Sequence, residues 1–229
     1  KIIEEYTESL NKNKSLINYD IEKILNRVTF LFIPMVNPDG IEIAVNGIDS
    51  LKNKDFYIKA NEGSNNFERW KANSRGVDLN KQFNADWKRT KSTEKPHFSD
   101  YKGPFFESEP ESKALADLTR NNHISAVVCF HHSGRVIYWY YKQGKSTFKR
   151  DQELVKQISK INGYDPVKPE ESDTKAAGYK DWFIKKFNKP GFTIEIGNKD
   201  KSKKPLPENK LPVFYKENRE VLLELAENL

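Results

Sequence analysis

The sequence predicts an α/β fold in which a mixed, mostly parallel sheet is flanked by helices on both faces. Two observations lead to this prediction. Apolar runs rich in β-branched and aromatic residues recur along the 229 residues, and patterns of helical period separate them. Alternating strands and helices favour parallel pairing, because each helix carries the chain back across the sheet. The length fits one domain, and we expect residues 1–229 to form it.

The first expected element is a helix at the start of the chain. Its apolar residues Ile2, Ile3, Tyr6 and Leu10 are spaced for one face, and no capping residue precedes them. Because the pattern begins at Lys1 without a cap, we expect further residues of the same domain to lie upstream.

The next segments combine one clear strand pattern with a long irregular stretch. We expect a central strand over residues 28–36, closed by turn residues at 37–40. Residues 46–104 show little periodicity, and only a short strand over 76–79 is expected there. Irregular segments of this length inside compact domains are usually functional.

The second half of the chain carries the more regular pattern. An acidic first turn that starts at Glu107 predicts the amino end of a helix, and a strand ending at His131 follows. The remaining expected elements are a strand over 136–141, helices over 152–161 and 178–187, a strand over 192–197 and a helix over 212–229.

Composition excludes several classes of protein. The net charge is +6, but lysines are interspersed with glutamates, so we expect a solvated surface and no nucleic-acid partner. No apolar run is long enough to span a membrane, and no signal segment opens the chain. The single cysteine, Cys129, lies in an apolar run and is expected to be a buried, inert thiol. The compartment stays open between cell-wall-associated or secreted and cytoplasmic.

The most informative junction is the end of the apolar run over residues 124–130, which stops on His131 and His132. A histidine at the carboxyl end of a buried strand lies where α/β proteins place their chemistry, so a metal or catalytic position is expected. Neighbours on an extended chain point to opposite sides, and we favour His131 as the metal ligand. The pair His97 and Asp100 has metal-like spacing, but it lies in a lysine-rich loop, where we expect an exposed histidine.

A carboxylate interrupts the last expected strand. Glu195 follows apolar residues, and such a position is unfavourable unless the carboxylate is paired, bound to a metal or at the rim of the sheet. An ordinary ion pair is one interpretation. Beside His131, Glu195 is instead a candidate general base next to a metal ligand.

A polar segment over residues 70–83 gathers hydrogen-bond donors. Lys71, Arg75, Asn80 and Lys81 are suited to bind a substrate carboxylate or to polarise a carbonyl group. The alternative interpretation is a polar loop without a role in binding.

Seven motifs taken together resemble one known family. They are Asn37-Pro38-Asp39-Gly40, Trp70-Lys71, Gly76-Val77-Asp78-Leu79-Asn80, Gly103-Pro104 with Glu109-Pro110-Glu111, Phe130-His131, Asp181-Trp182 and Phe192-Thr193-Ile194-Glu195. Their order and approximate spacing resemble the zinc carboxypeptidase family of the carboxypeptidase A and T type, over essentially the whole chain. The run over residues 178–193 is most similar to the bacterial branch that cleaves γ-D-glutamyl-diamino-acid bonds in peptidoglycan peptides.

The resemblance implies a role for each matching residue. It implies that His131 binds zinc, that Glu195 activates the zinc-bound water, and that the zinc polarises the scissile carbonyl. Asp78 is similar to the carboxylate that orients another zinc-binding histidine. Lys71 stands where the family usually has an arginine that polarises the scissile carbonyl.

The resemblance also implies contacts with substrate and a proton donor. Asn80 matches a contact with the substrate carboxylate, and Lys81 replaces an arginine that grips the terminal carboxylate in true carboxypeptidases. Lysine lacks the planar fork of arginine, which argues against a strict carboxypeptidase. The family's mobile active-site tyrosine would fall near Asp173, and Tyr179 is only a loose substitute.

The main departure from the family concerns the metal. Its members bind zinc through H-x-x-E together with the later histidine, and no H-x-x-E occurs in this chain. We expect that motif just upstream of Lys1, so that the chain is an N-terminally truncated catalytic domain, about its carboxyl-terminal three quarters. With one of three protein ligands, zinc is expected to be absent or weakly bound here, and the chain alone to have little or no activity.

The sequence thus predicts that the parent protein is a zinc-dependent metallopeptidase, most similar to enzymes that cut γ-D-glutamyl-diamino-acid bonds of bacterial cell-wall peptides. Two alternatives stay open, an ordinary metallocarboxypeptidase and a non-catalytic binding domain that has lost the metal site. The expected partner is a peptide or muropeptide. An incomplete sheet would leave an edge exposed, so self-association is also expected.

Overall fold

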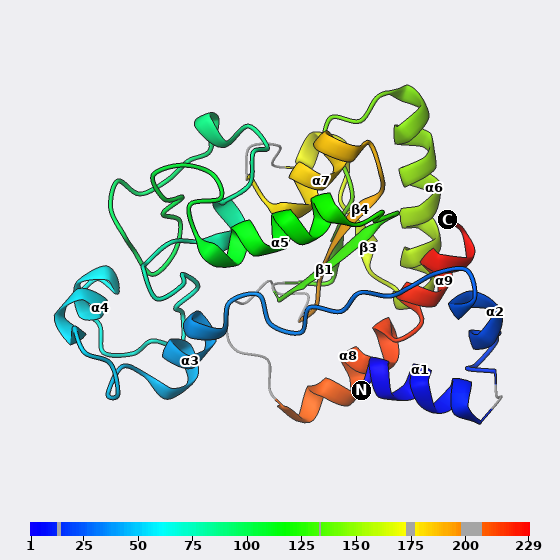
Figure 1. Ribbon diagram of the computed structural model, residues 1–229, viewed down its shortest axis with the longest axis horizontal. Helices are drawn as coiled ribbons and strands as arrows, with labels where there is room; N and C mark the ends of the chain where they lie inside the picture. Colours follow the sequence, from blue (N-terminus) through cyan, green and yellow to red (C-terminus); the bar gives the residue numbers. More distant parts are fainter. Residues whose placement is uncertain (13–14, 133, 173–176, 198–207) are drawn as a thin grey trace.

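A four-stranded sheet organises the structure, a computed structural model that describes residues 1–12, 15–132, 134–172, 177–197 and 208–229. In the described chain the strand order is β1-β4-β2-β3 (Figure 1). The strands are β1 (Val127–His131), β2 (Val136–Tyr138), β3 (Asp165–Pro166) and β4 (Gly191–Glu195). β1 pairs parallel with β4 and β2 parallel with β3, whereas β2 and β4 are antiparallel. The predicted mixed, mostly parallel sheet is confirmed.

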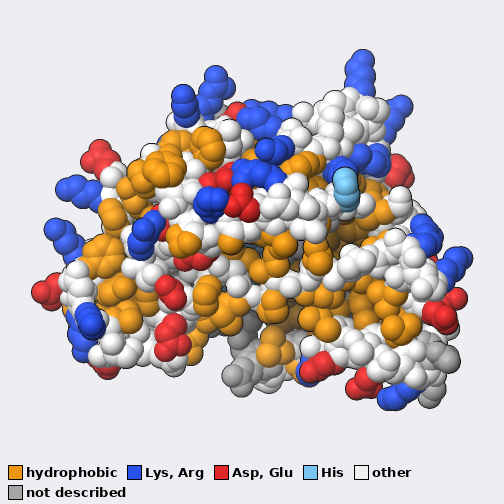
Figure 2. Space-filling model, viewed as in Figure 1, with side chains coloured by type: hydrophobic (Ala, Val, Ile, Leu, Met, Phe, Trp, Pro, Cys, Tyr) orange, Lys and Arg blue, Asp and Glu red, His pale blue; other side chains and the backbone are white. Residues whose placement is uncertain are grey.

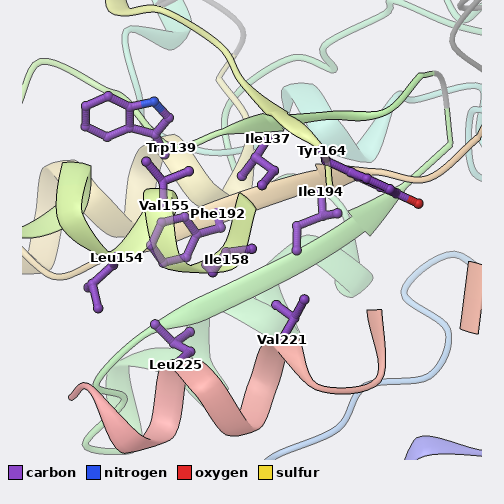
Figure 3. Close-up of a cluster of buried hydrophobic side chains, with 10 residues drawn as sticks. All are labelled: Ile137, Trp139, Leu154, Val155, Ile158, Tyr164, Phe192, Ile194, Val221 and Leu225. Atoms are coloured by element: carbon purple, nitrogen blue, oxygen red, sulfur yellow. The ribbon is translucent and has the colours of Figure 1, made fainter. Parts of the chain in front are cut away.

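One face of the sheet packs against helices α6 (Lys145–Asn162) and α9 (Val221–Glu227). Side chains on a strand alternate between faces, and Phe192 and Ile194 of β4 both point to this side. Figure 3 shows the resulting cluster, which joins strands and helices around fully buried side chains. It comprises Ile137, Trp139, Leu154, Val155, Ile158, Tyr164, Phe192, Ile194, Val221 and Leu225.

The opposite face packs against α5 (Pro110–Asn121) and α7 (Tyr179–Phe187). Val127 of β1 joins Trp182, Phe183 and Ile184 of α7 in this second cluster. Helix α7 lies so close to β4 that a Cβ on Gly191 would meet atoms of α7 at 3.1–3.3 Å. Helices therefore cover both faces, as the sequence predicts.

The two ends of the described chain pack together. Helices α1 (Ile2–Asn11) and α2 (Ile21–Leu25) share a buried cluster with α9, and the Tyr6 hydroxyl donates to the carbonyl of Arg219 at 2.6 Å. The expected first helix is confirmed. The single helix expected over 212–229 is wrong, because the chain breaks between α8 (Leu211–Asn218) and α9.

The central strand expected over residues 28–36 is also wrong. Val28 and Phe30 pack against the cluster of α1, α2 and α9, but the segment has no strand pairing with any described residue. Its following apolar side chains are exposed, and Figure 2 shows apolar side chains along the middle of the face where this segment runs in Figure 1. They are Leu31, Phe32, Ile33, Met35 and Val36. The composition favours a strand, but a strand also needs a neighbouring backbone to bond with.

The irregular first half contains short helices in place of the expected turn and strand. The residues expected to form a turn at 37–40 instead begin a helix, and the strand expected over 76–79 is wrong, since a 3₁₀ turn follows Asp78. These elements are α3 (Pro38–Asn46), α4 (Lys54–Ala60), η1 (Leu79–Lys81) and η2 (Trp87–Arg89), and later turns are η3 (Pro169–Glu171) and η4 (Glu208–Lys210). In the described ranges, none of the helices combines the length and apolar character needed to cross a bilayer.

Candidate active site

His131 and Glu195 lie side by side at the carboxyl ends of two parallel strands. They are register partners in the β1–β4 ladder. Alternation along each strand places both side chains on the face that α7 covers, with Val127 and Gly191. The sequence predicted both strand ends, and the pairing brings them together.

The surroundings keep the His131 imidazole neutral and raise the pKa of the Glu195 carboxyl group. Burial, with the charge of Lys71, lowers the pKa of His131 to about 4, so the ring is neutral at pH 7. Burial raises the pKa of Glu195, and the charge of Lys71 partly opposes that effect. Glu195 Oε2 is buried and has no hydrogen-bond partner among the described residues. A neutral imidazole and a buried, unpaired carboxylate oxygen suit a site that receives another group.

Lys71 is placed beside this pair by the residues at 37–40. Asn37 caps α3 by accepting a hydrogen bond from Gly40 N at 3.0 Å, and its amide donates to the carbonyls of Lys71 and Ala72, each at 3.1 Å. Any side chain at residue 40 would collide with Ala72 O, at 2.3 Å from a Cβ. The four-residue motif therefore holds the Lys71 backbone, and the Lys71 side chain remains exposed.

A second anchor fixes the loop that follows. Asn73 donates to the buried carboxylate of Glu109 at 2.8 Å, and its amide oxygen accepts from the backbone of Arg75 and Val77. Arg75 binds Glu109 through two nitrogens at 2.8 and 2.9 Å and also donates to Ser108 O at 3.1 Å. Arg75 thus holds the loop to the start of α5, and its predicted contact with substrate stays a prediction.

Asp78 and Asn80 lie at the turn that this loop leads into. Asp78 accepts hydrogen bonds from Asn80 N and from Asp100 N, each at 3.1 Å. Burial raises the pKa of Asp78, and these bonds and the charges of Lys81 and Lys71 oppose the rise. Asn80 lies over the start of α7, where a Cβ on Gly178 would be only 2.9 Å from its side-chain oxygen. The charge of Lys71 thus acts both on Asp78 and on Glu195.

Lys81 is not a free cation. Its Nζ lies 3.2 Å from Asp100 Oδ1 and donates to the carbonyl of Lys91 at 3.2 Å. Only 17% of its side chain is exposed. No sequence pattern predicts this ion pair, because only the folding of the loops brings its two residues together.

Other candidate residues lie elsewhere or are occupied. His97 is half-buried rather than exposed, since it stacks on Phe98 and its Nδ1 lies 3.0 Å from Ser99 O. The Tyr179 hydroxyl pairs with Thr119 at 2.7 Å. Asp173, near which a proton donor was expected, lies outside the described residues. Burial raises the pKa of the Cys129 thiol to about 12, which fits an unreactive cysteine.

A buried amide side chain that no sequence pattern indicated supports the whole segment. The side chain of Gln82 is fully buried and donates to the carbonyls of Lys102 and Phe105 at 2.6 and 3.2 Å. Its oxygen accepts from Glu109 N and from the Ser112 hydroxyl. An amide in a polar loop carries no pattern that separates it from solvated neighbours.

The fold is shared with solved carboxypeptidases. The carboxypeptidase A from Helicoverpa armigera superposes with a TM-score of 0.60 at 16% identity, covering 86% of this chain and 50% of that one. The strand arrangement is therefore that of the carboxypeptidase fold.

Sequence comparison assigns the family. The model of the family described as zinc carboxypeptidase matches residues 2–221. The γ-D-glutamyl-L-diamino acid endopeptidase 1 of Lysinibacillus sphaericus is 37% identical over 220 residues, or 94% of this chain and 53% of that protein. Mast cell carboxypeptidase A of Mus musculus is 28% identical over 225 residues, or 92% and 50%. The chain belongs to the zinc carboxypeptidase family, and it spans about half the length of the curated relatives it matches.

We predict that Glu109→Gln destabilises the protein by about 2 kcal/mol at pH 7, because it removes the charge-assisted bonds that hold the 73–77 loop. Burial alone would raise the pKa of Glu109, but bonds from Arg75, Asn73 and Ser108 lower it overall. Because the pKa of Glu109 is lower in the folded protein, its carboxylate stabilises the fold at pH values above its ordinary pKa of 4.5. This stabilisation is lost as the pH falls through the pKa of the folded state. Urea unfolding should therefore show that the difference in free energy of unfolding between wild type and Glu109→Gln becomes smaller as the pH is lowered.

The exposed pair Arg69–Glu62, with a separation of 2.7 Å, provides the matched control. Glu62→Gln should change stability much less than Glu109→Gln, because solvent screens an exposed ion pair. Equal effects of the two substitutions at pH 7 would contradict the role given to Glu109.

Proposed function

We propose that the protein to which this chain belongs is a metallopeptidase that hydrolyses an amide bond in bacterial cell-wall peptides, of the γ-D-glutamyl-diamino-acid type. The observation that carries the proposal is the juxtaposition of His131 and Glu195 at two strand ends, with a Glu195 oxygen buried and unpaired among the described residues. The similarity to the Lysinibacillus enzyme supports the substrate class.

In this proposal Glu195 is the general base. It takes a proton from the attacking water and returns it to the leaving amine, a role that needs a carboxylate whose pKa is moved toward neutrality. The exposed ammonium of Lys71, close enough to influence both Glu195 and His131, stabilises the negative charge that develops on the carbonyl oxygen. Asn80 contacts the substrate, and Asp78 orients a further metal-binding histidine.

The described residues do not fit a zinc ion by themselves. A catalytic zinc usually has three protein ligands. In the described part of the chain, no three histidine, cysteine, aspartate or glutamate side chains are grouped to hold a metal. We propose that His131 is one ligand and that the others lie in the protein outside residues 1–229.

Two other functions fit the fold. An ordinary metallocarboxypeptidase would require a free carboxylate beside the scissile bond, and Lys81, the residue expected from the sequence to bind it, is already paired with Asp100. A binding domain without catalysis would retain the fold and lack hydrolysis in the full-length protein.

We predict that Glu195→Gln in the full-length protein lowers kcat for a γ-D-glutamyl-diaminopimelate peptide by about 10²–10⁴-fold, because the base is removed. The midpoint temperature of thermal unfolding at pH 7 should not fall in this variant. Burial disfavours the ionised form of Glu195, so a neutral amide is tolerated there. Exposed Glu94→Gln is the control and should retain the wild-type rate. A Glu195→Gln protein with normal activity would contradict the proposal, and wild-type protein without hydrolysis would favour the binding domain.

We predict that the 229-residue chain alone binds zinc weakly, with a dissociation constant above about 1 μM, because its described residues group too few ligands around one point. Calorimetric titration with zinc chloride measures this affinity. In the full-length protein, His131→Gln should weaken binding, whereas the same change at exposed His123 should not. Nanomolar binding by the 229-residue chain, lost in His131→Gln, would show that the chain holds a complete site.

We also propose that the 229-residue chain self-associates. In the described sheet β1 is an edge strand, and the apolar side chains over residues 31–36 are exposed. A free edge and an uncovered apolar segment both favour pairing with a second copy.

The prediction is a mass by light scattering that rises with concentration. Phe32→Lys should reduce the association, because it places a charge in the exposed segment. Val45→Lys, at a residue of α3 that is 74% exposed, is the control and should have little effect. A strictly monomeric chain at high concentration would refute the proposal.

A further inference from the structure

The two lysines of the candidate site differ in how their charges are balanced. The Lys71 ammonium is exposed and makes no ion pair or hydrogen bond with the described residues. The Lys81 ammonium is mostly buried and is held between Asp100 Oδ1 and the carbonyl of Lys91. A substrate anion is therefore attracted to Lys71 and gains little from Lys81, whose charge is already neutralised.

Asp100 is fixed in place by contacts from separate segments. The backbone N–H of Asp100 donates to Asp78 Oδ2 at 3.1 Å. The Ser99 hydroxyl donates to Asp100 Oδ2 at 3.0 Å. Its φ is +69°, in the left-handed region that aspartate and asparagine tolerate better than most residues. Such conformations persist where surrounding contacts enforce them, and they cluster at functional sites.

The Asp100 carboxyl group is ionised at neutral pH. Burial raises its pKa, but the bonds from Lys81 and Ser99 and the charges of Lys81 and Lys71 lower it overall. Its side chain is still 59% exposed, so a bound substrate can meet the carboxylate. The charge of Lys71 contributes to lowering the pKa of Asp100, and it acts in the same direction on the pKa values of Glu195 and His131.

We propose that the Lys81–Asp100 ion pair determines specificity, by removing the attraction of the site for a free carboxylate next to the scissile bond. The proposal rests on the peptidase function above and deepens it. The enzyme then accepts substrates whose diamino acid is amidated or extended, and so acts as an endopeptidase. Lys81, which the sequence predicted to grip a substrate carboxylate, is held back from that role by Asp100.

The test uses the full-length protein and two γ-D-glutamyl-diaminopimelate peptides that differ only in a free or amidated α-carboxyl group on the diamino acid. The ratio of kcat/KM for the free over the amidated peptide is measured in wild type and in Asp100→Asn. Releasing the Lys81 ammonium should raise this ratio about 10-fold or more, mainly through KM. Asparagine tolerates the left-handed backbone, and the backbone bond to Asp78 is retained.

A second readout does not depend on turnover. Calorimetric binding of the two peptides to metal-free protein should show the same gain in preference for the free carboxylate in Asp100→Asn. The matched control is Asp49→Asn, because the exposed pair Lys54–Asp49 has the same 3.2 Å separation. This control should leave both ratios unchanged.

The double variant Asp100→Asn/Lys81→Met keeps the test decisive if the single variant folds poorly. It removes both charges, and its ratio should lie within about 3-fold of wild type, since the intact pair is already neutral. A ratio lowered 10-fold in the double variant would show that Lys81 grips the carboxylate in the wild type, which overturns the inference. An unchanged ratio in folded, active Asp100→Asn would also overturn it. Wild type that hydrolyses neither peptide defeats the proposed function itself.

Discussion

Parallel pairing of β1 with β4 is the constraint on which the candidate site depends. Two strands that run in the same direction end at one edge of the sheet, and the register sets His131 opposite Glu195. The strands hold this position because α7 packs tightly beneath them, where Gly191 leaves room for the helix. At this edge of the sheet, burial lowers the pKa of His131 and raises that of Glu195, whose Oε2 atom is shielded from solvent.

Buried and half-buried amide side chains take the place of secondary structure in the long irregular segment. A backbone without helix or ladder partners still needs hydrogen bonds when it is buried. Asn37, Asn73 and Gln82 supply them, since an amide both donates and accepts. Each of the three joins segments distant in sequence, and together they connect α3, the 71–82 loop and the start of α5. The position of Lys71 relative to the sheet follows from these contacts.

The sequence predicted the sheet-and-helix half of the molecule better than the irregular half. Periodicity identified β1 and α7, because their apolar residues pack against neighbours that are themselves regular. It failed over residues 28–36, where an apolar composition fits a strand but the described chain offers no backbone to pair with. The strand expected at 76–79 failed because capping by Asp78 favours a 3₁₀ turn.

Residues of the candidate site also differ in how well the sequence predicts them. His131 and Glu195 could be predicted as strand ends, since polar residues that close apolar runs stand out in the sequence. The pairing of Lys81 with Asp100 could not, because eighteen residues lie between them in the sequence and only the fold brings their charged groups within 3.2 Å. Arg75 illustrates the same limit, since its donors fit a ligand carboxylate and a buried Glu109 equally well.

The left-handed backbone conformation at Asp100 limits the residue types that fit at that position. Most side chains strain such a conformation, and asparagine and glycine are the replacements that fit it most readily. Both lack a charge, so either would leave the Lys81 ammonium without its carboxylate. Under the specificity role proposed for the Lys81–Asp100 pair, a single substitution of this kind would shift the protein from one class of substrate to another.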